Sequence, residues 1–301
     1  MKLTSFNAVE DIQTTLDDHH YITRRSLATS IYLSLKMGMP IFLEGEPGVG
    51  KTEVAKVLSR ILDTELIRLQ CYEGLDVHNA IYEWNYSKQI LQIRLLEAGG
   101  ETDNEKMAQE IFGQEFLIKR PLYQALEHRG ETPAVLLIDE LDRADEEFEA
   151  YLLEILSDYQ VSVPELGTVE ASQIPLVFLT SNGTRELSEA LKRRCLYLYI
   201  DYPDLERERA IVTAKVPDID ENLADQVTRI VRSVRQLDLK KHPSVSETLD
   251  WARTLVLLGV ERIDAEVAAD TANVLLKYRT DIDKAVKEFA DNADELAEGA
   301  A

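Results

Sequence analysis

Eight residues, GEPGVGKT from Gly45 to Thr52, constrain the fold of this chain more than any other stretch. They follow the apolar run PIFLE and precede EVAKVLSRIL, where apolar residues recur at helical spacing. The pattern G-x-x-x-x-G-K-[ST] is that of a phosphate-binding loop between a strand and a helix. Glycines let the backbone wrap a phosphate, and the helix directs its first N–H groups at the same anion. The stretch predicts a nucleotide site made of Gly45, Glu46, Pro47, Gly48, Val49, Gly50, Lys51 and Thr52.

The last two residues of the loop have side chains that can bind the phosphates and the metal ion of a nucleoside triphosphate. Lys51 is predicted to reach the β- and γ-phosphates, and the Thr52 hydroxyl is predicted to hold Mg²⁺. The expected cofactors are therefore ATP and Mg²⁺, although these residues alone leave the choice between adenine and guanine open.

Composition narrows the choice of partners and compartment. The chain of 301 residues has 33 Lys and Arg against 55 Asp and Glu, and a formal net charge of −22, which disfavours nucleic acid as a partner. Its sequence has no apolar stretch of membrane-spanning length and no apolar signal-peptide core, so we expect a cytoplasmic protein. The two cysteines, Cys71 and Cys195, are predicted to be packing residues, and the five histidines have no metal-ligand spacing.

Five apolar runs alternate with helical stretches in the first two thirds of the chain. Such alternation predicts an α/β fold with a parallel sheet that is covered on both faces. From about Leu205 the apolar spacing is helical throughout, which predicts a core domain over residues 1–203 and a small helical domain over 204–301. The polar tail DNADELAEGAA is expected to fray. The runs are PIFLE, ELIRLQ, AVLLIDE, IPLVFLTSN and CLYLYID.

Polar residues end two of these runs, at the sheet edge where open α/β sheets bind ligands. Asp139 and Glu140 follow AVLLI, and they are predicted to hold Mg²⁺ and to act as general base toward water, respectively. Asn182 ends the run VFLTSN and is predicted to contact the γ-phosphate or orient the water. The alternative for all three is an ordinary solvated strand end or turn.

Two arginines, Arg193 and Arg194, come just before the last strand. A guanidinium group suits a phosphoryl oxygen that gains charge during transfer. An exposed basic helix end that complements the helix dipole is the alternative.

The order of phosphate loop, acid-ending strand, Asn-ending strand, paired arginines and helical C-terminal part resembles that of AAA+ ATPases. More narrowly the chain resembles the MoxR family, and within it the CoxD-like branch associated with carbon monoxide dehydrogenase maturation. The stretch VHNAIYEWNYSKQILQIRLLEA, about residues 77–98, resembles the family's helix insert, and YQVSVPELGTVEASQ, about residues 159–172, resembles its hairpin.

This resemblance implies a five-stranded sheet of order 5-1-4-3-2, a helical lid and a hexameric ring. It also implies that a neighbouring subunit supplies the catalytic arginine, Arg194 or Arg193, and that ATP hydrolysis remodels a client. The client would be a metalloenzyme such as a molybdenum hydroxylase, with a von Willebrand A domain protein as partner. The chain departs from the family at the lid, where Glu247 stands near the second-sensor position and the nearest arginine is Arg253. Tyr21 and Ile22 are candidates for an adenine contact.

Two other functions remain open at this point. The first is a nucleic-acid-associated or restriction-type NTPase, against which the net charge of −22 weighs. The second is a nucleotide-gated scaffold that does not hydrolyse, against which the presence of Glu140, Asn182 and Arg194 weighs.

Overall fold

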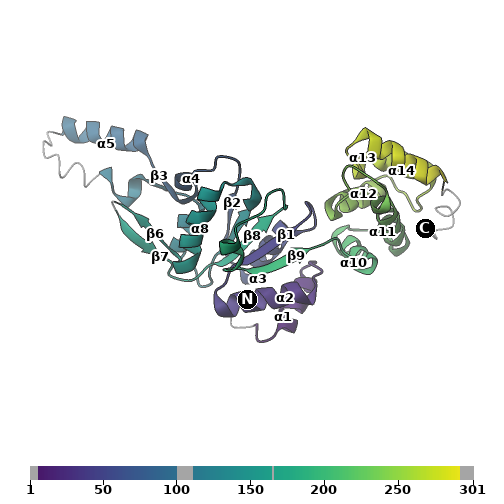
Figure 1. Ribbon diagram of the computed structural model, residues 1–301, viewed down its shortest axis with the longest axis horizontal. Coiled ribbons are helices and arrows are strands. Elements are labelled where there is room, and N and C mark those ends of the chain that lie inside the picture. Colours follow the sequence, from purple (N-terminus) through teal and green to yellow (C-terminus); the bar gives the residue numbers. More distant parts are fainter. Residues whose placement is uncertain (1–5, 100–110, 165, 292–301) are drawn as a thin grey trace. The chain divides into compact units, whose positions relative to one another are not determined.

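The computed structural model describes residues 6–99, 111–164 and 166–291, and its centre is a five-stranded sheet (Figure 1). The strands lie in the order β2-β5-β8-β1-β9. If these five strands are numbered 1 to 5 along the chain and read from β9 to β2, their order is 5-1-4-3-2. This order confirms the predicted parallel α/β fold. Their bounds are β1 Ile41–Gly45, β2 Leu66–Gln70, β5 Val135–Asp139, β8 Leu176–Ser181 and β9 Leu196–Ile200.

The central strands β5 and β8 are buried on both faces, as their continuous apolar runs predict, whereas the edge strands β2 and β9 have exposed residues. On one face, alternate strand residues such as Leu136, Ile138 and Leu179 pack in one cluster with residues of α7 (Pro121–Glu127) and α8 (Glu146–Asp158). The residues between them, including Leu137 and Phe178, are fully buried on the other face. The carboxyl ends of β5 and β8 therefore stand on a rigid, desolvated base.

The predicted insert and hairpin regions contain short paired strands. β3 pairs antiparallel with β4, and β6 pairs antiparallel with β7. α5 extends away from the sheet within this part of the chain (Figure 1). The bounds are α4 Val77–Ile81, β3 Tyr82–Trp84, α5 Tyr86–Ala98, η2 Gln114–Phe116, β4 Leu117–Lys119, β6 Gln160–Val163 and β7 Gly167–Glu170. The remaining elements before β9 are α1 Val9–Asp18, α2 Arg25–Met37, α3 Lys51–Leu62, η3 Leu141–Arg143 and α9 Glu189–Lys192.

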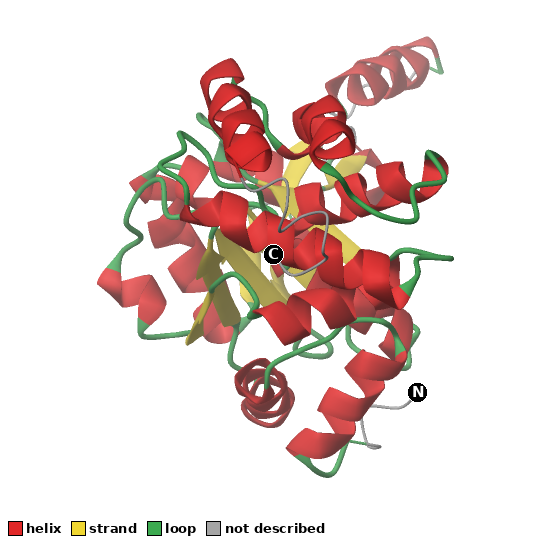
Figure 2. Ribbon diagram, turned by 90° about the vertical axis from the view of Figure 1, so that its right-hand side faces the viewer, coloured by secondary structure: helices red, strands yellow, loops and turns green. Residues whose placement is uncertain are grey.

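Every element described after β9 is a helix (Figure 2). These helices share one apolar core, in which the fully buried Trp251 donates its indole N–H to Thr271 Oγ1 at 2.7 Å. A capping box begins α12, where Ser244 and Glu247 exchange hydrogen bonds. The bounds are α10 Leu205–Lys215, α11 Glu221–Gln236, α12 Val245–Leu257, α13 Ala265–Leu275 and α14 Arg279–Asp291.

Contacts divide the chain into two compact units. The core unit holds the residues up to Ile12, Arg25–Glu44 and Thr52–Leu198. The loop and lid unit holds Gln13–Arg24, Gly45–Lys51 and the chain from Tyr199 onward. The predicted domain boundary at residue 203 stays a prediction, and the predicted frayed tail lies, from residue 292, outside the described residues. Within the described ranges, none of the helices has the length and apolar character needed to span a bilayer.

Candidate nucleotide site

The phosphate loop connects β1 to α3, as its sequence predicts, and two contacts fix its glycines. A Cβ on Gly45 would lie 2.1 Å from the carbonyl oxygen of Ile200, so only glycine fits where β1 ends beside β9. Gly48 has φ of 79° and Gly50 has φ of 100°, which are left-handed conformations that favour glycine. The loop therefore has the backbone shape that a phosphate cradle requires.

Lys51 lies inside this loop and is only 6% exposed. Its ammonium group donates to the carbonyl oxygens of Gly45 at 2.6 Å and Glu46 at 2.8 Å. A buried ammonium needs such acceptors, and phosphate oxygens are stronger acceptors of the same kind. The loop thus positions one buried cation where the motif places it.

The start of α12 contacts the phosphate loop within the loop and lid unit. The Ser246 N–H and Oγ both donate to the carbonyl oxygen of Gly48, each at 3.3 Å. A Cβ on Gly48 would lie 2.2 Å from Ser244 Oγ. Arg253 lies further along α12 and pairs with Asp250 at 3.1 Å, so serines rather than an arginine make the lid's contact with the loop.

A buried ion pair supports the turn that leads into α12. Arg235 donates to both carboxylate oxygens of Glu208, at 2.6 and 2.8 Å, and to the carbonyl oxygen of Pro243 at 2.8 Å. Its guanidinium group lies 4.6 Å from the ring centroid of Tyr202. Sequence analysis missed this group, because Glu208 and Arg235 are 27 residues apart and no local pattern relates them.

Tyr21 and Ile22, the candidates for an adenine contact, belong to the same unit as the loop. The Tyr21 hydroxyl donates to the carbonyl oxygen of Gly50 at 3.3 Å. The Ile22 carbonyl accepts from Arg207, whose pKa is lowered mainly by burial. The segment is therefore held against the loop, where an adenine contact stays a prediction.

The metal-binding candidates, Thr52 and Asp139, lie together at the carboxyl edge of the sheet. The Thr52 hydroxyl donates to Asp139 Oδ1 at 3.0 Å, and the Thr180 hydroxyl donates to the same oxygen at 2.6 Å. Asp139 is only 3% exposed, and its second oxygen, Oδ2, accepts two hydrogen bonds from Arg68. A hydroxyl beside a carboxylate is the hard oxygen donor set that Mg²⁺ takes in nucleotide sites, so the residues present fit that ion.

Glu140, the predicted general base, has an unusual backbone conformation with φ of 56° and ψ of 48°. Its N–H donates to Thr180 Oγ1 at 2.9 Å, and its carboxylate pairs with Arg143 at 3.3 Å. A non-glycine residue held in the left-handed region costs about 1–3 kcal/mol and marks functional sites when surroundings impose it. Here Thr180 fixes the backbone of Glu140 and the side chain of Asp139 together.

Asn182 is positioned by Asp142, a residue that sequence analysis did not single out. The Asp142 carboxylate accepts from the N–H groups of Asn182 at 3.2 Å and Thr184 at 3.1 Å, and from the Thr184 hydroxyl at 2.5 Å. Burial alone would raise the pKa of Asp142, but these hydrogen bonds outweigh it and lower the pKa. The turn after β8 is thus tied to the turn after β5.

We expect Asp142→Asn to lower the free energy of unfolding by about 1–3 kcal/mol at pH 7, because it weakens acceptance of three hydrogen bonds. Since the folded pKa of Asp142 is depressed, its contribution is complete above the ordinary value of 3.8 and is lost as pH falls through the folded pKa. Denaturant unfolding at pH 7 and below pH 4 measures this. Asp283→Asn, an exposed aspartate of α14, is the control, and a gap between wild type and Asp142→Asn that persists in acid would contradict the assignment.

Arg193 and Arg194 lie at the amino ends of the parallel strands, whereas Asp139 lies at their carboxyl ends. Both are exposed and precede β9, whose first residue Leu196 donates to the carbonyl oxygen of Pro40, directly before β1. Arg194 donates to the carbonyl oxygen of Leu153 at 3.4 Å and lines a cavity of about 640 Å³. The structure therefore does not bring the two arginines to the carboxylates of their own core unit.

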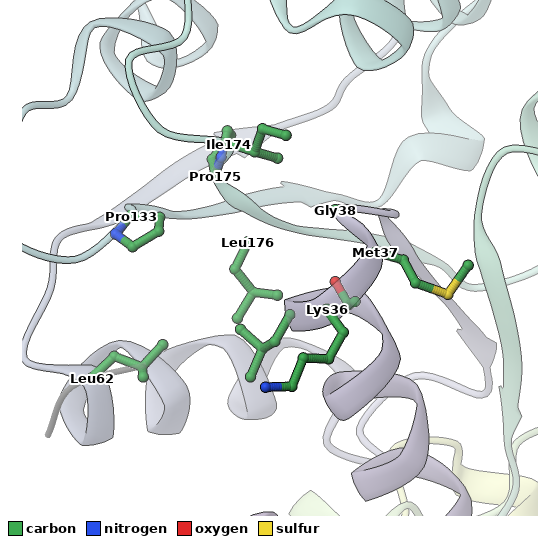
Figure 3. Close-up of a pocket in the computed structure, with 10 residues that line it drawn as sticks. Lys36, Met37, Gly38, Leu62, Pro133, Ile174, Pro175 and Leu176 are labelled. Carbon is green, nitrogen blue, oxygen red and sulfur yellow. The ribbon is translucent and has the colours of Figure 1, made fainter. Parts of the chain in front are cut away.

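A second cavity, of about 350 Å³, lies at this amino edge between the end of α2 and the loop before β8 (Figure 3). It has an apolar lining that includes Met37, Leu62 and Ile174, and it shares Met37 and Ile174 with the cavity beside Arg194. The two cavities are therefore adjacent, and Arg194 lines the larger of them.

Both cysteines have the packing role that the sequence predicts. Cys71 and Cys195 are free and buried, and burial raises the pKa of each thiol to about 12. A thiol of that pKa stays protonated at neutral pH and is a poor nucleophile or metal ligand.

Comparison with known proteins found similar chains at low sequence identity. The gas vesicle ATPase GvpN of Haloferax mediterranei is 26% identical over 211 residues, and the match spans 67% of this chain but only 58% of that protein. An uncharacterized protein of Staphylococcus aureus is 24% identical over 235 residues, with 74% of this chain and 80% of that protein covered. A structure of a Thermotoga maritima RuvB variant aligns with 91% of this chain and 72% of its own, with 17% identity and a TM-score of 0.47.

A family model settles the assignment. The model of the AAA domain of the dynein-related subfamily matches residues 40–195, which run from β1 through the phosphate loop and the acidic strand end to the paired arginines. This match spans just over half of the 301 residues. The chain belongs to the dynein-related subfamily of AAA domains.

Proposed function

We propose that this chain binds ATP with Mg²⁺ and hydrolyses it. The observation that carries the proposal is the 3.0 Å hydrogen bond from Thr52, the last residue of the phosphate loop, to Asp139 at the end of β5. Thr52 and Asp139 would hold Mg²⁺, which would supply positive charge to the bound phosphates. Glu140 would accept a proton from the attacking water, and Asn182 would orient that water.

The arginine would come from a neighbouring subunit. Arg194, with Arg193 beside it, is exposed at the amino ends of the strands, and Asp139 lies at their carboxyl ends. This separation supports action on another copy's nucleotide. An interface that joins one end of a subunit's sheet to the opposite end of the next subunit's sheet is head-to-tail, and it forms a closed ring when the rotation between subunits closes. A hexameric ring is the assembly that the resemblance to MoxR proteins implies.

We expect Lys51→Ala to abolish nucleotide binding, because it removes the buried cation that the loop holds for the β- and γ-phosphates. Equilibrium titration with fluorescent ATP in excess Mg²⁺ is the measurement. Lys56→Ala is the matched control, since Lys56 lies on the same helix but pairs with Glu53 at the surface. If Lys51→Ala binds as tightly as wild type, the loop is not a nucleotide site.

The work that hydrolysis drives would be remodelling of a protein client. Four large apolar side chains of α5, Tyr86, Ile90, Leu91 and Leu95, are 54–65% exposed, which supports a protein-binding surface on the insert. The resemblance to CoxD-like proteins supports a metalloenzyme client of the molybdenum hydroxylase type and a von Willebrand A domain partner, in the cytoplasm. Stimulation of ATP turnover by a von Willebrand A protein encoded beside this gene tests the partner.

Two outcomes would point to other functions. Tight ATP binding by the wild-type protein without turnover, alone or with such a partner, would favour a nucleotide-gated scaffold. Retention of duplex DNA at low ionic strength would favour a nucleic-acid-associated NTPase despite the net charge of −22.

A further inference from the structure

Arg68 contacts the carboxylate that the proposed function gives to the metal. It lies on β2, beside Leu137 of β5, and its side chain reaches along the sheet edge to Asp139. Its Nε donates to Asp139 Oδ2 at 3.0 Å and its Nη2 donates to the same oxygen at 2.6 Å. Arg68 Nη2 also donates to Gln70 Oε1 on the same strand.

The two oxygens of Asp139 have different partners. Oδ1 accepts from the hydroxyls of Thr52 and Thr180, which belong to elements on either side of the site. Oδ2 accepts both strong contacts of Arg68 and only a longer bond, 3.3 Å, from Thr52. One oxygen is therefore fixed by neutral groups, and the other is neutralised by a cation.

A carboxylate this buried needs a positive partner. Asp139 is 4% exposed at its side chain, and two further acids, Glu140 and Asp142, follow it closely in the chain. An unpaired charge in such a place is strongly unfavourable, so a cation beside Asp139 stabilises its ionised form when Mg²⁺ is absent. Arg68 supplies that cation, and with 48% of its side chain exposed it has room to move away.

We propose that Arg68 is the resident counter-ion of Asp139 and gives up Oδ2 when magnesium and nucleotide bind. The inference rests on the proposed function, because Thr52 and Asp139 must be the metal-binding pair. Magnesium binding is then an exchange of one cation for another on Oδ2, whether the ion contacts that oxygen directly or through a water. Arg68 thereby weakens the protein's apparent affinity for magnesium and keeps the empty site electrically balanced.

The test compares nucleotide binding with and without the metal. Fluorescent ATP is titrated into wild type, Arg68→Gln and Arg60→Gln, first in EDTA and then in excess Mg²⁺. Arg60→Gln is the matched control, because it removes the same charge from an exposed pair with Glu53 on α3. The measured quantity is the dissociation constant for ATP in EDTA divided by that in excess Mg²⁺. We expect this ratio to be about tenfold larger in Arg68→Gln than in wild type, the scale of a charge-assisted hydrogen bond, and to be unchanged in the control.

A second measurement uses Mg²⁺ alone. Thermal unfolding without nucleotide should show a lower midpoint for Arg68→Gln, and millimolar Mg²⁺ should raise that midpoint by about 2–4 °C more than it raises the wild-type midpoint. Arg68→Lys keeps the charge, but its ammonium cannot make both contacts with the same geometry. Its midpoint and its response to Mg²⁺ should therefore lie between those of wild type and Arg68→Gln.

Several results would overturn the inference. If the ratio of dissociation constants in EDTA and in Mg²⁺ is the same in Arg68→Gln as in wild type, Arg68 does not compete with magnesium. If ATP binding is weakened equally with and without the metal, Arg68 contacts the phosphates instead. Either result leaves the proposed function standing, because the wild type still binds ATP more tightly with Mg²⁺. If the wild type binds no ATP, or gains nothing from Mg²⁺, both the function and the exchange are wrong.

Discussion

Replacing Arg194 by alanine is expected to reduce ATP turnover by about 10³-fold while ATP still binds, the usual scale for losing an arginine finger. The charge that develops on the γ-phosphoryl group in transfer would lose its guanidinium donor. Steady-state turnover and equilibrium titration with fluorescent ATP measure the two effects separately. Arg193→Ala is the companion variant, since both arginines are exposed directly before β9, and the larger loss identifies the finger.

Arg194 lies at the amino end of β9, away from Asp139 and Glu140 of its own subunit. A mixing experiment can therefore test whether it acts on the nucleotide of a neighbouring subunit. Arg194→Ala and Glu140→Gln are each expected to be inactive, for different reasons. If an intact Glu140 in one subunit can face an intact Arg194 of its neighbour, mixing the two proteins should restore part of the turnover, at a level set by their ratio. A flat curve at every ratio, with exchange of labelled subunits confirmed, would mean that the arginine does not act across the interface.

Glu140→Gln is expected to bind ATP and Mg²⁺ but to turn over at least about 10²-fold more slowly, the scale of losing a positioned base. Glutamine keeps the shape of the side chain but cannot accept the proton of the attacking water. If ATP binds at the subunit interface that we propose, the unhydrolysed nucleotide should hold the subunits together, and sedimentation in ATP should show a stable oligomer. Glu147→Gln, an exposed acid in the first turn of α8, is the control. Wild-type turnover in Glu140→Gln would assign the base to another residue.

The main features of the fold were predictable because they depend on local patterns. The central strands β5 and β8 carry nearly continuous apolar runs, and two buried faces produce such runs directly, whereas the edge strands β2 and β9 alternate exposed residues with less exposed ones. The helix α14, Arg279–Asp291, falls within the predicted helical region after Leu205, but its apolar pattern is weak, with buried Ala285 and Phe289 four residues apart. Its seven charged residues in RTDIDKAVKEFAD hide a narrow apolar stripe, because one helix face suffices to close the lid core.

The candidate site was predictable where its residues follow one another in sequence and unpredictable where the sheet brings them together. Gly45 to Thr52 and the pair Asp139 and Glu140 are motifs with fixed spacing. The partners of those motifs come from other strands and loops, as Arg68 does for Asp139 and Thr184 for Asp142. These pairs are 71 and 42 residues apart, so only the register of the strands could have revealed them.

The contact between Gly48 and the start of α12 has a consequence for control of the enzyme. Two backbones meet there, through the Ser246 N–H and the Gly48 carbonyl, with Ser244 filling the place of a missing Cβ. Since the contact is this close and involves the loop backbone itself, a shift of α12 toward the loop moves the phosphate loop with it. A protein that bound the lid and shifted α12 would therefore change the affinity for nucleotide. Thermodynamic reciprocity then requires nucleotide to change the affinity for that protein by the same factor.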